Sequence, residues 1–508
     1  MLEYKTYKKL SQRRIKGAGE FMLFNSIQFM LFFPVVAAIY FILPSQRFRR
    51  WFLLAASCYF YMSFIPVYIV ILIIGGVFDF AGSNLIEKYS DKPEIKKICL
   101  AVPIVIELAL LAYFKYAYFT ADIINFFGLK IGLDTLVLPK IILPIGISFH
   151  TFQGIGYMVD VYYGKVKAQK DPVTYTLFLM FFPQLVAGPI ERTQNLMPQF
   201  YENHYLTYKN LSQGGRLMLW GMVKKILIAD NLAIFVDAVY KSPQDYGGAG
   251  IYIAVIFFAF QIYCDFSGYS DIAIGAAQIM GFRLMKNFDM PYFATSMTNF
   301  WRKWHISLST WFRDYIYIPL GGNRVSRPRW CLNQMITFTV SGLWHGASFT
   351  FVIWGFLHGL ILIVEKLTEN IRKKISGFLK FGRLNFIKTF LCVCYTFCVT
   401  CITWVLFRSD TLDDALYILK RVFSGLSEFM PVNKIAEMFA GIPRQKLYVS
   451  IFGIILLLAA DFLCKKSDFR TAAGKIPVYA RIPMYAFLIC LILIFGAYET
   501  KSFIYFQF

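Results

Sequence analysis

The sequence predicts an all-α, polytopic membrane protein with roughly eleven membrane helices. Of the 508 residues, 57% are hydrophobic and 19% are aromatic, whereas soluble domains contain roughly 45–50% apolar residues. Apolar stretches of the roughly 20 residues that cross a hydrocarbon core recur along the whole chain. No internal repeat and no low-complexity linker separates them, so we expect one membrane domain.

The apolar runs follow one another from the amino end to the carboxyl end. Several are too long for a single span or are interrupted by Pro and Gly, which predicts re-entrant or interfacial pieces in addition to the spans. The runs cover residues 22–43, 51–63, 67–84, 98–127, 141–160, 172–190, 214–240, 249–281, 332–364, 386–407, 447–464 and 478–498.

The chain carries 52 Lys and Arg against 30 Asp and Glu, a net charge of +22. The basic residues cluster in short loops between apolar runs, as the positive-inside bias predicts, so we expect contact with membrane lipid and none with nucleic acid. The cysteines are scattered, apart from four inside one apolar run, which favours helix packing over a disulfide framework or a metal site. These four are Cys392, Cys394, Cys398 and Cys401.

Loop charge also predicts the orientation. Loops 366–388 and 465–481 are rich in Lys and Arg and should be cytoplasmic, so the last span runs outward. Loop 408–446 has mixed charge and fits the outside. At the amino end, residues 1–20 and 47–50 are both basic, so the first span receives no clear orientation.

Three segments are therefore distinguished. Residues 1–21 form a basic extension, which would not be translated if Met22 is the true start; the mass of the native protein decides this. Residues 22–498 form the membrane domain. Residues 499–508 form an extracytoplasmic tail that ends in FIYFQF.

The densest set of polar residues within apolar sequence is NFWRKWHISLSTWFRDYIYIPLGGNR, residues 299–324. Its aromatic and leucine residues recur at helical spacing, and its charges make it too polar to span. We expect an amphipathic helix along the membrane surface that ends at Pro319 and Gly321. A simple interfacial anchor would show the same pattern.

A second stretch, SGLWHGASFTFVIWGFLHGL, covers residues 341–360. His345 lies deep in it, where an apolar setting favours a neutral imidazole that can act as a base. Gly342 and Gly346 would let a backbone or a substrate approach closely. A buried histidine satisfied by one hydrogen bond is the alternative, and it is the interpretation we adopt for His358.

Both stretches closely resemble the membrane-bound O-acyltransferase (MBOAT) family. Other segments are similar to its alginate O-acetylation branch, which is related to the membrane protein of D-alanyl transfer to lipoteichoic acid. The resemblance runs from Met22 through nearly the whole chain. These segments are FFPQLVAGPIER (181–192), PIGISFHTFQGIGYMVDVY (144–162), YCDFSGYSDIAIG (263–275) and TWVLFRSDTLDDALYIL (403–419).

The resemblance implies the MBOAT fold, with its helices around a central funnel, and an acyl transfer. It places the intramembrane histidine of the family at His345 and the second histidine at His305, at the mouth of the funnel. These roles fit the chemistry of acyl transfer. An acceptor hydroxyl needs a base, which His345 could be, and His305 could orient that base or stabilise an oxyanion. Further candidates are one histidine, His150, for which a structural role is the alternative, and the site-lining residues Asn299, Trp304, Asn323 and Trp344. The sequence contains no metal-binding motif and no G-x-S-x-G elbow.

The predicted activity is transfer of an acyl group, with acetyl favoured, from a cytoplasmic thioester to an extracytoplasmic polysaccharide across a bacterial cytoplasmic membrane. The donor would be acetyl-CoA or an acyl-carrier thioester, with no bound cofactor. The partners would be an esterase-like (SGNH) acyltransferase outside the membrane and the glycan itself. A transporter or flippase without covalent chemistry is the competing class, although no matched pair of broken helices is visible. A structural subunit of a secretion complex is a third.

The tail suggests how the acyl group crosses. A roughly 30 Å core separates donor from acceptor, and Tyr505 offers one hydroxyl among Phe503, Phe506 and Phe508. The spacing F-x-Y-x-x-F resembles the C-terminal peptide of the small partner protein in the D-alanine branch, which implies an acyl relay through Tyr505. An aromatic belt at the membrane interface is the alternative.

Overall fold

The computed structural model describes residues 22–186, 188–378, 385–424, 438–439, 441–464, 468–498 and 503–504. These residues form helices and no strands, so the all-α architecture is confirmed. Seven helical stretches within them are long and apolar enough to cross a membrane. The rest of the roughly eleven expected spans would have to come from helices that are shorter or more polar, such as α2 and α16. The seven are Pro66–Lys88, Pro93–Ile131, Gly248–Ile279, Phe349–Leu367, Phe386–Arg408, Arg444–Leu463 and Val478–Phe495.

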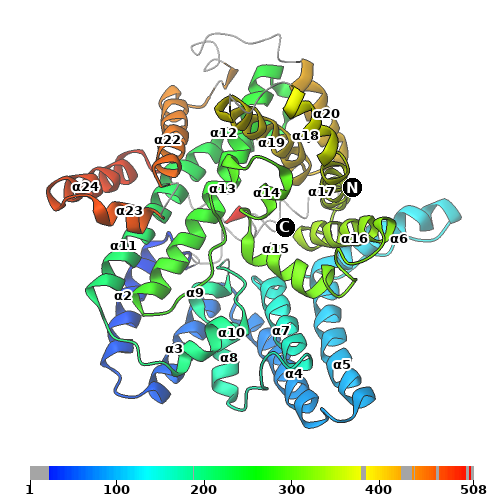
Figure 1. Ribbon diagram of the computed structural model, residues 1–508, viewed down its shortest axis with the longest axis vertical. Helices are drawn as coiled ribbons and strands as arrows, with labels where there is room; N and C mark the ends of the chain where they lie inside the picture. The colour runs from blue at the N-terminus through cyan, green and yellow to red at the C-terminus, as the bar shows by residue number, and fades with distance from the viewer. Residues whose placement is uncertain are drawn as a thin grey trace.

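Most of the amino-terminal helices occupy the lower half of Figure 1, whereas α6 lies at the right edge beside α16. In the lower half α4 packs against α5 and α7, and α3 packs against α8. The bounds are α2 (Ile27–Ile42), α3 (Gln46–Met62), α4 (Ile69–Lys88), α5 (Pro93–Leu111), η2 (Ala112–Tyr116), α6 (Ala117–Gly128), α7 (Ile147–Tyr162), α8 (Pro172–Met180), α9 (Phe182–Leu185) and α10 (Thr193–Leu196).

The centre of the molecule is α13 (Gly248–Ile279), which packs along α11 (Tyr208–Met222), the π-helical turn η5 (Val223–Ala229) and α12 (Asp230–Lys241). Glycines make this contact close: a Cβ at Gly214 would lie 2.6 Å from the carbonyl oxygen of Gly275. Backbones this near each other require small residues, as at other membrane helix crossings. The core of the protein therefore lies along α13.

The carboxyl-terminal helices complete the wall around α13. α16 pairs with α17, α17 packs on α19, and α22 and α24 contact η5. The bounds are α16 (Arg327–His345), α17 (Phe349–Leu367), α18 (Glu369–Phe378), α19 (Asn385–Arg408), α20 (Leu412–Ser424), α22 (Arg444–Leu463), α23 (Phe469–Lys475) and α24 (Val478–Phe495). Short 3-10 turns are η1 (Pro66–Tyr68), η3 (Leu129–Ile131), η4 (Met197–Tyr201), η6 (Pro243–Asp245) and η7 (Pro291–Phe293).

The segment 299–324 differs from its prediction. Instead of one helix it forms α14 (Met297–Trp301), α15 (Ile306–Phe312) and the π-helical turn η8 (Arg313–Tyr317). The predicted apolar face does point inward, since Phe300, Trp304, Leu308 and Trp311 are all buried. The helix is interrupted at residues 302–305, where the backbone also pairs with another segment: the Asp289 amide donates to the Lys303 carbonyl oxygen (3.0 Å), and the Ile306 amide donates to the Asn287 carbonyl oxygen (2.9 Å).

Candidate active site

His305 and His345 lie together although 40 positions separate them in the sequence. Their ring centroids are 6.5 Å apart, and the two side chains are 0% and 3% exposed. His345 is the last residue of α16, and His305 joins α14 to α15. His305 is therefore enclosed within the protein, and the edge-on ring of Phe266 covers it at 4.6 Å.

His305 has a backbone conformation that a non-glycine residue rarely adopts, with φ 42°. Two contacts with Asn287 hold it: the amide of Ile306 donates to the Asn287 carbonyl oxygen (2.9 Å), and the Ser307 hydroxyl donates to Asn287 Oδ1 (2.6 Å). Ser307 Oγ in turn accepts the amide of Ile190 (3.1 Å). Backbone strain that the surroundings enforce in this way is typical of functional sites.

His345 is positioned by the close pairing of α16 with α17. A Cβ at Gly342 would lie 2.3 Å from the carbonyl oxygen of Phe351, and one at Gly355 would lie 2.3 Å from that of Phe338. The expected role of Gly342 in close backbone approach is thus confirmed. The imidazole of His345 packs against three rings, those of Trp344 (5.0 Å), Trp354 (5.1 Å) and Phe407 (5.3 Å).

A cavity of about 70 Å³ opens beside His345. It can hold a few water molecules or a group of similar size, such as an acetyl group. Its walls come from η2, from the loop and first turn of α7, and from the end of α16. The lining residues are Lys115, Leu143, Pro144, Ile145, Gly146, Ile147, Ser148, Phe149, Val186, Trp344 and His345.

Burial also fixes the protonation of the second histidine. It lowers the pKa of His305 to about 3, because the loss of solvation disfavours the charged imidazolium. His305 is therefore neutral at physiological pH and can accept a proton or donate a hydrogen bond, according to its tautomer.

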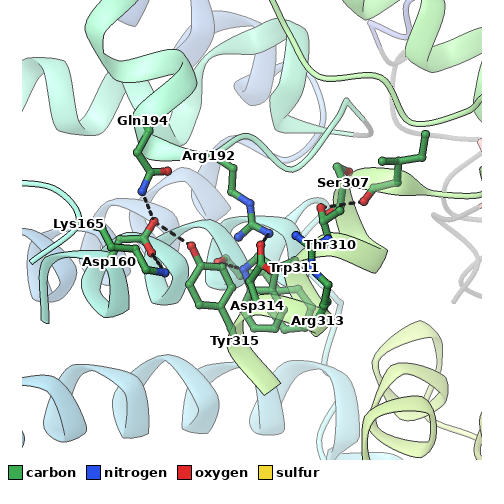
Figure 2. A network of polar contacts seen from close by, with 12 residues as sticks. Asp160, Lys165, Arg192, Gln194, Ser307, Thr310, Trp311, Arg313, Asp314 and Tyr315 are labelled. Atoms are coloured by element: carbon green, nitrogen blue, oxygen red, sulfur yellow. Dashed lines mark hydrogen bonds and ion pairs between the residues drawn. The ribbon is translucent and has the colours of Figure 1, made fainter. Parts of the chain in front are cut away.

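A network of polar contacts ties η8 to α7 and fixes the segment that carries His305 (Figure 2). Asp160 accepts hydrogen bonds from the Tyr315 hydroxyl (2.9 Å) and from Gln194 (3.0 Å). The Arg192 guanidinium pairs with Asp314 at 2.9 Å and stacks on the Tyr315 ring at 4.7 Å. Because several elements share these contacts, η8, which follows His305 and α15 in the chain, is held by tertiary structure and not by a single helix.

The tail reaches the same region. Phe503 and Ile504 are buried, 0% and 3% exposed. The Ile504 amide donates to Asp265 Oδ2 (2.8 Å), and the Phe503 ring contacts that of Phe266 (5.6 Å), which also covers His305. Tyr505 lies outside the described residues.

Asp265 belongs to a buried charge cluster formed by η5, α12 and α13. Lys225 Nζ lies 2.6 Å from Asp265 Oδ1 and 2.8 Å from Asp230 Oδ1, and all three side chains are at most 5% exposed. Two carboxylates share one ammonium, and the tail amide supplies a further donor to Asp265.

Sequence comparisons identify the family. The profile of the membrane-bound O-acyltransferase family matches residues 168–408. A Pseudomonas aeruginosa protein named "Probable alginate O-acetylase AlgI" is 37% identical over 439 residues, which are 85% of this chain and 82% of that protein. The chain belongs to the membrane-bound O-acyltransferase family.

Other relatives have different acceptors in their names. The peptidoglycan O-acetyltransferase of Helicobacter pylori is 34% identical over 430 residues, 78% of this chain and 79% of that protein. The teichoic acid D-alanyltransferase of Bacillus subtilis is 26% identical over 275 residues, 52% of this chain and 68% of that protein. The MBOAT chain is thus an O-acyltransferase with several membrane spans, and the transporter interpretation is not favoured.

Of the four residues predicted to line the site, the two tryptophans lie next to the histidines and the two asparagines do not. Trp344 lines the cavity and lies 6.4 Å from His305, centroid to centroid. Trp304 precedes His305 and stacks in an aromatic cluster with Phe300. Asn299 instead accepts the amide of Thr295 (3.3 Å) at the start of α14, and Asn323 is exposed.

The structure also places His358 and His150, the two other histidines considered in the sequence. His358 accepts a hydrogen bond from the indole N–H of Trp301 (3.3 Å), as a core histidine would. His150 is buried on α7 close to Glu107: a Cβ at Gly75 would lie 2.3 Å from Glu107 Oε1 and 3.5 Å from His150 Cε1. The α7 side of the cavity wall is formed by residues 147–149 and does not include His150.

Sequence reasoning missed Lys115 and the Lys225 cluster. Lys115 Nζ donates to the Trp344 carbonyl oxygen (2.5 Å) at the end of α16. Both lysines interrupt long apolar runs, and an ionisable residue inside such a run is itself a signal of function.

Proposed function

We propose that this MBOAT protein transfers an acetyl group from a cytoplasmic thioester to an envelope polysaccharide outside a bacterial cytoplasmic membrane, and that Tyr505 carries the group between them. The relay is supported by the position of the tail: Ile504, whose amide is hydrogen-bonded to Asp265, directly precedes Tyr505. Phe503 contacts the same Phe266 ring that covers His305.

In the first step the Tyr505 hydroxyl attacks the thioester carbonyl while His345 takes its proton. The C–S bond breaks, and the leaving thiolate recovers that proton from His345. A phenol has a pKa near 10, far below that of a sugar hydroxyl. The acetyl-tyrosine ester is therefore reactive enough to pass its acyl group to a serine or sugar hydroxyl.

In the second step a hydroxyl of an acceptor outside attacks the ester carbonyl, the bond between the acetyl group and the Tyr505 oxygen breaks, and that oxygen takes up the proton of the attacking hydroxyl. An SGNH-type acyltransferase would supply this hydroxyl and deliver the acetyl group to the glycan. The names of the P. aeruginosa and H. pylori relatives support acetyl as the group and a polysaccharide as the final acceptor. The donor is acetyl-CoA or an acyl-carrier thioester, and purified protein supplied with each in turn distinguishes them.

The test is Tyr505→Phe, which deletes one oxygen and preserves the ring. Base-labile acetyl groups on envelope polysaccharide, measured in a deletion strain that expresses each variant at equal membrane levels, should fall to the background of the empty strain. Tyr498→Phe is the matched control, since it also deletes one hydroxyl near the carboxyl end, and the Tyr498 hydroxyl donates to the Ile492 carbonyl oxygen (2.6 Å). Wild-type acetylation by Tyr505→Phe would end the relay proposal.

A further inference from the structure

We infer that Lys115 stabilises the oxyanion that forms during acyl transfer. The inference rests on the proposed thioester donor but not on the tail relay. Lys115 lies in η2, the π-helical turn between α5 and α6. π-Turns inside longer helices often mark functional sites.

The position of the ammonium is set by the end of α16. Nζ donates to the carbonyl oxygens of Trp344 (2.5 Å) and His345 (3.4 Å). The neighbouring Tyr116 hydroxyl donates to the carbonyl oxygen of Leu343 (2.9 Å). The negative end of a helix dipole favours a cation at this point. Lys115 is therefore fixed to the same helix end that presents His345.

The charge of Lys115 has no carboxylate beside it among the residues that the structure describes. Two carbonyl oxygens take two of its three N–H donors, so one donor remains at the wall of the cavity. His345 lines the same cavity. An ammonium next to the base, with no carboxylate partner in the described part of the chain and facing a space of acetyl size, is suited to a developing negative charge.

The chemistry places that charge. As the acceptor oxygen bonds to the thioester carbonyl carbon, its proton passes to His345 and the C=O electron pair moves onto the carbonyl oxygen. Lys115 donates to this oxyanion. When the C=O bond re-forms, the C–S bond breaks and the thiolate takes the proton from His345. Lys115 gains or loses no proton in the cycle.

A purely structural role as a helix cap is the alternative, and the variants are chosen to separate the two. Lys115→Gln keeps N–H donors for the α16 carbonyls but removes the charge, whereas Lys115→Arg keeps the charge. Tyr116→Phe removes the other side-chain donor to the last turn of α16 and serves as the matched control. Acetylation of envelope polysaccharide in the deletion strain requires no knowledge of donor or acceptor.

At matched membrane levels, Lys115→Gln should slow acetylation by about 10²–10³-fold, the usual cost of one oxyanion donor. Lys115→Arg should retain about a tenth of the activity or more, and Tyr116→Phe should stay within about threefold of wild type. With purified protein and the accepted thioester, the loss in Lys115→Gln should be in kcat and not in KM. Near-wild-type activity of Lys115→Gln, or equal losses in Gln and Arg, would overturn the inference. So would a rise in KM at unchanged kcat.

Discussion

Removing the Asp265 carboxylate should release the tail from the interior. The Asp265→Ala variant deletes the acceptor of the Ile504 amide. It leaves Lys225 paired with Asp230 at 2.8 Å, so no buried ammonium is stranded. The variant therefore perturbs the seat of the tail more than the fold.

The magnitude follows from one charged hydrogen bond. Hydrogen bonds to ionised groups contribute about 1.5–3 kcal/mol, which corresponds to about a 10- to 150-fold change in the ratio of docked to undocked tail. Burial of Phe503, which is fully enclosed, contributes roughly 1.5–3 kcal/mol and is retained. The tail of the variant should thus still dock for part of the time.

Carboxypeptidase digestion followed by intact-mass measurement reports the fraction of molecules in which the C-terminal tail is docked. In wild type Ile504 should resist release, and in Asp265→Ala its release should accelerate by about tenfold or more. Asp271→Ala is the control, because Asp271 lies on the same helix and pairs with Lys224 instead (2.6 Å). Unchanged protection in Asp265→Ala, or equal loss in Asp271→Ala, would refute the reasoning.

Three further predictions follow from the site and its surroundings. His345→Ala should abolish acetylation at normal membrane levels, whereas His305→Ala should cost about 2.7–4 kcal/mol of barrier, as for one oxyanion-stabilising or positioning group; near-normal transfer by His345→Ala would remove it from its role. Cysteines replacing the exposed Arg302 and Arg313 should react with an impermeant thiol reagent from the same side of the membrane, and reaction from opposite sides would mean that the segment spans. Burial raises the pKa of Glu191 from 4.5 to about 7. Because the pKa is higher in the folded state than in the unfolded state, the contribution of Glu191 to the free energy of unfolding is complete below pH 4.5. It is lost as the pH rises to about 7, a decrease in stability of about 3 kcal/mol. Thermal unfolding against pH should show this slope in wild type and not in Glu191→Gln, and a slope that persists in the variant would assign it elsewhere.

Apolar length and motif spacing were sufficient to predict the all-α membrane fold, because each spanning helix must satisfy its own backbone. The pairing of His305 with His345 came from family resemblance and not from periodicity. Helical spacing in 299–324 correctly indicated the buried face. It could not reveal the break at His305, since that break depends on Asn287, which is remote in the helical pattern.

The residues that sequence reasoning did not identify are those whose role depends on contacts with another element. Lys115 is distinguished only by its hydrogen bond to the end of α16, more than 200 positions away. Asp265 is distinguished only by its hydrogen bond to the amide of Ile504 in the tail. Asn323 belongs to a matching motif and is exposed in the turn after η8, and its role in lining the site stays a prediction. Motif membership indicates a family, and tertiary contacts decide which motif residues face the chemistry.

The relay is tested most directly by peptide mapping of the carboxyl terminus. Wild-type protein, isolated from cells that lack the outside acyltransferase and given the thioester donor, should carry a base-labile acetyl ester on Tyr505. The ester should be absent from His345→Ala, whose tail remains intact. A Tyr505 that is never acetylated while the wild-type protein transfers acetyl groups to polysaccharide would contradict the account.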